Sequence, residues 1–230
     1  MILYINGDSH SAAGEAVNDY CFAEDDPKYF YMGRAPHPDN LKVSYGAELG
    51  KLLKAKLKCD AESASSNDRI IRTTEQFLTL PSNDKIFIII GWSTWEREEW
   101  HHEGRYWQVN AGGIGEDWPD AIKDRYKPWV AGLDMNTKMV QEHDKIFNFH
   151  KKLKDKGIKH LFFNSYEALT VPRQVDWGNN YINPYDKNFT YYNWAIANGH
   201  KPVNPDSYHF GARTHFEWAQ YLVKHLTKLL

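Results

Sequence analysis

A run of five apolar residues, Ile86-Phe87-Ile88-Ile89-Ile90, most constrains the fold of this chain. A strand with apolar side chains on both faces is typical of the centre of a parallel sheet that helices cover on either side. Strand and helix patterns alternate along the chain, as such a sheet requires. Expected strands are Ile2–Ile5, Leu57–Asp60, Lys85–Ile90 and Lys159–Asn164, and expected helices are Tyr45–Lys56, Asn67–Thr79, Asn136–Lys156 and Ala212–Leu229. We therefore predict α/β architecture: a single domain over residues 1–230, with three α/β/α layers and a central parallel sheet.

Composition narrows the classes of function. With 230 residues, 42% of them hydrophobic, the chain can fill one sizeable core. Its formal charge of −2 and sequence pI of about 6.6 give no broad basic surface, so we expect no nucleic-acid partner. No apolar stretch approaches the length of a membrane span, and the N-terminus lacks signal-peptide features, so we expect no membrane association and a cytoplasmic location.

A Gly-Asp-Ser turn follows the first expected strand. It would place Ser9 at the carboxyl edge of the sheet, where a serine nucleophile belongs in an α/β enzyme. Glycine, aspartate and serine are also the commonest turn residues, so a purely structural turn is the alternative.

A second motif, Asp206-Ser207-Tyr208-His209, precedes the last expected helix. A serine nucleophile needs a base to accept its proton and a carboxylate to orient that base. From a single loop, His209 and Asp206 could supply both. The two motifs together favour a Ser-His-Asp hydrolase.

These two motifs, in this order at the two ends of the chain, resemble the first and last signature blocks of the SGNH (GDSL) hydrolase family. The resemblance implies a flavodoxin-like fold and ester hydrolysis through an acyl-enzyme, without a cofactor or metal. Ser9 would be the nucleophile, His209 the general base and Asp206 its orienting acid. The segments Ser66–Ile70 and Gly91–Ser93 are similar, more loosely, to uncharacterised phage-encoded members.

The two middle blocks of the family depart from its pattern. They supply oxyanion-hole donors, from a glycine N–H and an asparagine side chain. Here Ala64 (or Ser65) stands at the glycine position and Ser93 at the asparagine position. The resemblance thus implies an oxyanion hole formed by the N–H groups of Ser9 and Ala64 and by the Ser93 hydroxyl, which is shorter than a carboxamide.

Three long stretches rich in aromatic residues, 13–43, 92–133 and 165–205, follow expected strands. Ligands bind at this edge of open α/β sheets, and aromatic faces suit sugar rings. We expect Trp92, Trp95 and His10 to contact substrate, and a carbohydrate O-acyl ester, such as an O-acetyl ester, as substrate. The alternative for any single tryptophan is that it fills a small core within its own insertion.

Two further questions stay open at this point. The departures in the middle blocks favour a second function, a catalytically weakened glycan-binding or virion-associated protein. Arg69 and Arg97 could bind an anionic group of a substrate or form salt bridges within the loops. We expect no metal site: Cys21 and Cys59 lack metal or redox spacing, and the adjacent His101 and His102 should point apart.

Overall fold

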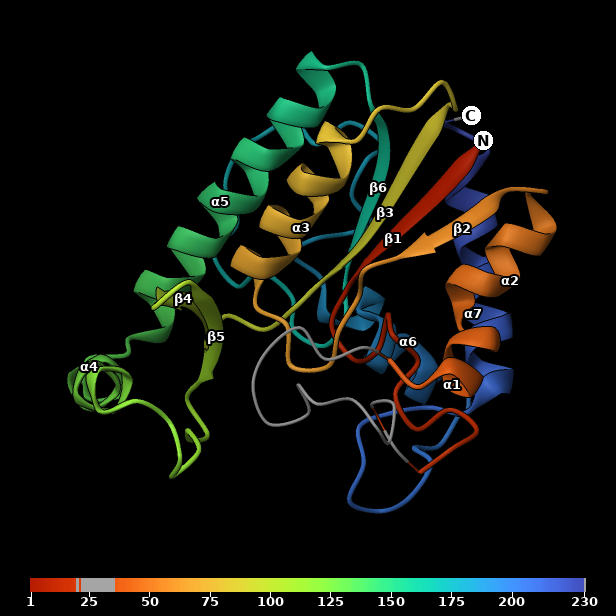
Figure 1. Cartoon of the computed structure of the whole chain (residues 1–230). Coiled ribbons are helices and arrows are strands. Elements are labelled where there is room, and N and C mark those ends of the chain that lie inside the picture. The colour runs from red at the N-terminus through yellow and green to blue at the C-terminus, as the bar shows by residue number, and fades with distance from the viewer. Residues whose placement is uncertain (20, 22–35, 230) are drawn as a thin grey trace.

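Four parallel strands form the central sheet of the computed structural model (Figure 1), which describes residues 1–19, 21 and 36–229. The strands are β1 (Ile2–Gly7), β2 (Lys56–Cys59), β3 (Ile86–Trp92) and β6 (Lys159–Asn164), in the order β2-β1-β3-β6. The apolar run predicted to be central is β3, which pairs with β1 on one side and β6 on the other. The carboxyl ends of all four strands therefore meet at one edge of the sheet.

Helices cover both faces of this sheet (Figure 1). On one face, α2 (Tyr45–Leu52) and α7 (Ala212–Leu226) pack against Leu3, Phe87 and their neighbours. On the other face, α3 (Asn67–Thr79) and α5 (Met135–Asp155) pack against Tyr4 and Ile88. Because successive strand side chains point to opposite faces, each strand contributes to both cores. The predicted three-layer α/β architecture with a parallel sheet is confirmed.

Local sequence signals position the helices that flank the site. The side chains of Ser44 and Ser66 accept hydrogen bonds from backbone N–H groups in the first turns of α2 and α3. Such caps satisfy donors that a helix start otherwise leaves free. The predicted bounds of α3 match the structure, whereas α2 and α7 end several residues earlier than predicted. Besides the elements of the insertion after β3, the elements that were not predicted are α1 (Pro38–Lys42), the 3-10 helix η1 (Lys187–Phe189) and α6 (Tyr191–Ala197).

The insertion after β3 folds into a hairpin and a helix with a small core of their own. Strands β4 (Arg97–His102) and β5 (Arg105–Asn110) pair antiparallel, and α4 (Asp120–Ala131) packs beside them (Figure 1). Their buried side chains are Trp100, Trp107, Val109, Trp118 and Ile122. Most aromatic residues of this insertion therefore stabilise the insertion itself, which is the alternative that the sequence left open.

Two further expectations concern single features. Neither Cys21 nor Cys59 is in a disulfide. Among the described helices, none combines the length and the apolar character that a membrane span requires. Residues 22–35, which carry several aromatic residues of the first insertion, lie outside the described part of the chain.

Candidate active site

The loop after β1 begins at a glycine that no other residue could replace without a shift. Gly7 has φ +151°, and a Cβ there would lie 2.2 Å from Ser11 Oγ and 2.7 Å from the Gly91 carbonyl oxygen. This close approach holds the loop against the end of β3. In the next residue, Asp8, the side-chain Oδ1 accepts a hydrogen bond from the backbone N–H of His10 at 3.1 Å and so shapes the turn.

Ser9 lies at this turn and lines a pocket of about 390 Å³ together with His10 and His209. Its side chain is largely covered, with 8% of the residue exposed. The pocket volume falls in the range of small-molecule sites. Ser9 and His209 thus face the same cavity, although 200 positions separate them in the chain.

The carboxylate beside His209 belongs to Glu15. Its Oε2 lies 2.5 Å from His209 Nδ1 and accepts the Ser207 hydroxyl at 2.6 Å. The same Ser207 oxygen accepts the backbone N–H of His209 at 2.9 Å. Burial alone would raise the pKa of Glu15, but the hydrogen bonds from Ser207 and His209 hold that pKa below its ordinary value. An ionised carboxylate only accepts, so Nδ1 carries the proton and Nε2 is left as the basic nitrogen.

The structure differs here from the expectation for Asp206. Asp206 is exposed, and its backbone N–H donates to Asn204 Oδ1 at 3.0 Å within a turn. The turn directs this residue to the surface, and Glu15 occupies the position beside Nδ1. Sequence reasoning missed Glu15 because an isolated Ala-Gly-Glu-Ala segment carries no recognisable motif; its only signal was its closeness to Ser9 in the chain. The backbone of Glu15 has φ +60°, an uncommon value for a glutamate.

Of the expected oxyanion-hole residues, Ala64 lines the pocket. It has φ +61°, the left-handed conformation that favours glycine. Alanine stands here at the position that the resemblance assigns to glycine, and the chain adopts this turn at some cost in strain. Ser65 is fully buried and lies outside the lining of the pocket.

Ser93 has a different environment from the one expected of a donor to substrate. Its Oγ accepts a hydrogen bond from Arg97 Nη1 at 2.9 Å, and its backbone N–H donates to Asn67 Oδ1 at 2.8 Å. Arg97, not Ser93, lines the pocket, and its guanidinium lies 3.8 Å from Asp8 Oδ2. Arg69, the other arginine considered from the sequence, forms a salt bridge with Glu62 at 2.5 Å, which was one of the two alternatives.

The expected aromatic contacts also differ. Trp92 is 1% exposed and packs in the core between the sheet and α5, and Trp95 packs against the same core. Neither therefore offers a face to the pocket. Instead, the aromatic walls come from Tyr166 and Tyr208, whose rings contact edge to face at 5.6 Å. Tyr208 is 60% exposed, which leaves its ring accessible from solvent.

Two ionisable side chains complete the pocket wall. His10 is 5% exposed, and burial, followed by the nearby His209 and Arg97, holds its pKa well below its ordinary value, so it is neutral. Burial and the neighbouring Glu96 raise the pKa of Glu167, against the effect of Arg97. The Oε2 atom of Glu167 is buried and makes no hydrogen bond within the described part of the chain.

Comparison with solved structures identifies the fold. A carbohydrate esterase family 2 enzyme with a carbohydrate binding domain, from Corynascus thermopiles (Myceliophthora fergusii), matches 99% of this chain at a TM-score of 0.50 and 15% identity. The chain has the SGNH (GDSL) hydrolase fold. The chain spans 66% of the length of that enzyme, slightly less than two thirds.

Two further structural similarities are weaker. A carbohydrate esterase described as having divergent catalytic and non-catalytic binding functions gives a TM-score of 0.49 at 12% identity, over 99% of this chain and 64% of its own. A putative lipolytic protein of the G-D-S-L family from Desulfitobacterium hafniense DCB-2 gives 0.44 at 10% identity, over 97% and 98%. No protein-family model and no curated protein sequence matches the chain.

Proposed function

We propose that this protein is a serine esterase that hydrolyses a small acyl ester of a carbohydrate through an acyl-enzyme. The observation that carries the proposal is the pair formed by Glu15 and His209 beside a pocket that Ser9 also lines. A histidine oriented by a carboxylate, next to a serine at the carboxyl edge of a parallel sheet, is the arrangement that activates a hydroxyl group for acyl transfer.

In the proposed reaction, Ser9 Oγ attacks the carbonyl carbon of the ester while its proton passes to His209 Nε2. Glu15 keeps the imidazole in the required tautomer and stabilises the imidazolium that forms. The imidazolium then gives this proton to the departing alcohol oxygen. A water molecule, deprotonated in turn by His209, attacks the acyl carbon and releases the acid and Ser9.

Charge that develops on the carbonyl oxygen requires donors near Ser9 and Ala64. We propose the backbone N–H groups of these two residues, with Arg97 adding a positive charge at the side of the pocket. In this proposal Ser93 acts through Arg97, because the Ser93 hydroxyl accepts a hydrogen bond from the Arg97 guanidinium. Asp206 has no catalytic role.

The carbohydrate part of the proposal rests on the pocket wall. The Tyr166 and Tyr208 rings offer apolar faces, and the polar side chains of Thr94, Glu96 and Glu167 also line the pocket. A long acyl chain would bury these polar groups without partners, which disfavours a lipid ester.

An activity-based fluorophosphonate probe tests the proposal directly. We expect the wild-type protein to be labelled and Ser9→Ala to be unlabelled. Ser63→Ala is the matched control, because Ser63 lines the same pocket and should leave labelling intact. Equal labelling of wild type and Ser9→Ala would refute Ser9 as nucleophile. A folded wild-type protein that binds acetylated oligosaccharides but resists the probe would favour the glycan-binding alternative.

A further inference from the structure

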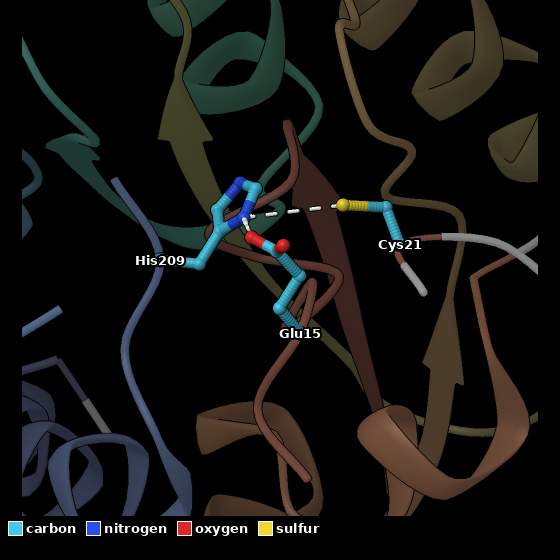
Figure 2. A group of neighbouring side chains, drawn as sticks. All are labelled: Glu15, Cys21 and His209. Carbon is cyan, nitrogen blue, oxygen red and sulfur yellow. Dashed lines mark hydrogen bonds and ion pairs between the residues drawn. The ribbon is translucent and has the colours of Figure 1, made fainter. Parts of the chain in front are cut away.

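Three potential metal ligands, the side chains of Glu15, Cys21 and His209, meet at the Nδ1 side of the His209 imidazole, away from Nε2. Figure 2 shows Glu15, Cys21 and His209 with their polar atoms directed toward a common point. Their ligand atoms all lie within 4.8 Å of one another, with 2.5 Å between Glu15 Oε2 and His209 Nδ1 and 3.9 Å between Cys21 Sγ and Nδ1.

One of these two separations is close to what a tetrahedral cation requires, and the other needs a small movement of one side chain. Zinc bonds of about 2.0–2.3 Å to oxygen, nitrogen and sulfur place neighbouring ligand atoms about 3.3–3.7 Å apart. The sulfur–nitrogen distance of 3.9 Å already approaches this value. Only the Glu15 carboxylate, on a flexible side chain, must move outward by roughly 1 Å from its hydrogen-bonded position.

Gly14 leaves the space beside these atoms open. A Cβ at this position would lie 3.2 Å from Cys21 Sγ, 3.4 Å from His209 Cε1 and 3.5 Å from His209 Nδ1. Any larger residue would therefore crowd the thiol and the imidazole at the point where they meet.

The donor set also has the charge and chemistry for one class of ion. A carboxylate and a thiolate together carry two negative charges, which a divalent cation balances, and a neutral imidazole is the third donor. This mixture of sulfur, nitrogen and oxygen ligands suits zinc and related borderline metals, not magnesium or calcium.

We propose that Glu15, Cys21 and His209 form a binding site for a zinc-class divalent cation, whose occupation switches off the base. On binding, the Cys21 thiol releases its proton to solvent, and the Nδ1 proton of His209 is transferred through solvent to Nε2. The neutral imidazole then carries its proton on Nε2. That nitrogen has no lone pair left to accept the Ser9 proton, so acyl transfer stops. The inhibitory consequence rests on the proposed esterase function, whereas binding itself does not.

Cobalt(II) binding tests the site without any assay of activity. We expect cobalt to give a near-ultraviolet thiolate-to-metal charge-transfer band with the wild-type chain and its visible bands to have tetrahedral intensity. Cys21→Ser should lose the charge-transfer band and weaken zinc affinity at least tenfold in competition with a chromophoric chelator. Cys59→Ser, the matched control, should retain both. Gly14→Ala should weaken binding while preserving all three ligands.

Inhibition is measured separately on an ester that the protein accepts. Zinc should inhibit the wild type reversibly, with recovery on addition of a chelator, and Cys21→Ser should need at least tenfold more zinc. A cobalt complex without a thiolate band, or identical bands in wild type and Cys21→Ser, overturns the proposal. A thiolate band in a protein without esterase activity would uphold the metal site and refute only the proposed function.

Discussion

Glu15 Oε2 contacts His209 Nδ1 at 2.5 Å, and these two residues come from opposite ends of the chain. The contact exists because the loop after β1 and the loop before α7 both lie at the carboxyl edge of the sheet. It assigns the orienting carboxylate to the same loop that carries Ser9.

This assignment predicts opposite outcomes for two conservative substitutions. Glu15→Gln should lower kcat by about 10²–10⁴-fold, because a neutral amide neither fixes the tautomer nor stabilises the imidazolium. Asp206→Asn, on the same loop as His209 but exposed, should change kcat less than twofold. Steady-state kinetics on a small acetyl ester measure both effects. If Asp206→Asn were the more damaging change, Glu15 would not be the acid.

The Ser93–Arg97 hydrogen bond predicts a non-additive pair of substitutions. Ser93→Ala should lower kcat about tenfold, or roughly 1.4 kcal/mol, with little change in KM, because Arg97 is held less firmly. In an Arg97→Met background the same change should have little further effect, because its only route of action is gone. A full tenfold loss in that background would instead show that the Ser93 hydroxyl acts directly.

Backbone strain at Ala64 predicts that glycine is tolerated there. Ala64→Gly should preserve probe labelling and raise the free energy of unfolding by up to about 1 kcal/mol, because alanine is strained at φ +61°. Ala61→Gly is the control: Ala61 is fully buried without a positive φ, so glycine there should be destabilising. Denaturant unfolding measures both. Destabilisation by Ala64→Gly would contradict the strain argument.

Tyr208 predicts a change in substrate binding that spares the chemistry. Tyr208→Ala should raise KM for an acetylated oligosaccharide by about three- to tenfold through loss of one ring contact, while leaving kcat on a small aryl acetate unchanged. Tyr106→Ala is the comparison, because Tyr106 is an exposed tyrosine of the β4–β5 hairpin that lies outside the pocket. Equal effects of the two variants on KM would remove the support for a sugar ring at Tyr208.

A buried histidine pair predicts acid sensitivity of the fold. His160 Nδ1 donates to the Ile158 carbonyl oxygen at 2.8 Å, so Nε2 accepts from His150 Nδ1, also at 2.8 Å. Burial lowers the pKa of His160 to about 4. Between about pH 6.5 and 4 the unfolded chain binds a proton that the folded chain does not, so stability falls as pH falls.

The expected loss from His160 is on the order of 3 kcal/mol by pH 4, and it should be visible as a falling midpoint of urea unfolding. His160→Gln should flatten this dependence, whatever its effect on stability at neutral pH. His101→Gln, at an exposed position on β4, should leave the slope unchanged. An unaltered slope in His160→Gln would assign the acid sensitivity to other groups.

The sequence predicted the frame of this protein more fully than its site. Apolar runs such as Ile86–Ile90 and caps such as Ser66 are local signals, and they act through burial and hydrogen bonding close by in the chain. The hairpin β4–β5 was missed because its charged and histidine-rich strands lack clear alternation. The sequence left open that the tryptophans of this insertion fill a small core of their own, and most of them do.

The functional residues likewise divide into those that lie in local motifs and those that depend on contacts between distant segments. Ser9 and His209 lie in recognisable motifs, and both line the pocket. Glu15 could not be found from spacing, because its position depends on a contact with His209, which is distant in sequence. Arg97 was named from the sequence, but its choice between a substrate group and a salt bridge stayed open. Asp206 was expected to orient His209 because aspartate three residues before histidine is a familiar pattern, yet the turn at Asn204 carries it to the surface.

The short separation of Ser9 and Glu15 along one tightly turned loop has a mechanical consequence. Two of the three proposed catalytic groups are carried by one rigid body, which Gly7 fixes against β3. The third group lies on a second loop, which the Pro202–Phe210 bridge and the 2.9 Å bond from the Val203 N–H to the His209 carbonyl oxygen close on itself. The Ser207 hydroxyl of this loop donates to Glu15. Any displacement of this second loop therefore moves His209 away from Ser9, its proton donor, and from Glu15, its counter-ion, at the same time.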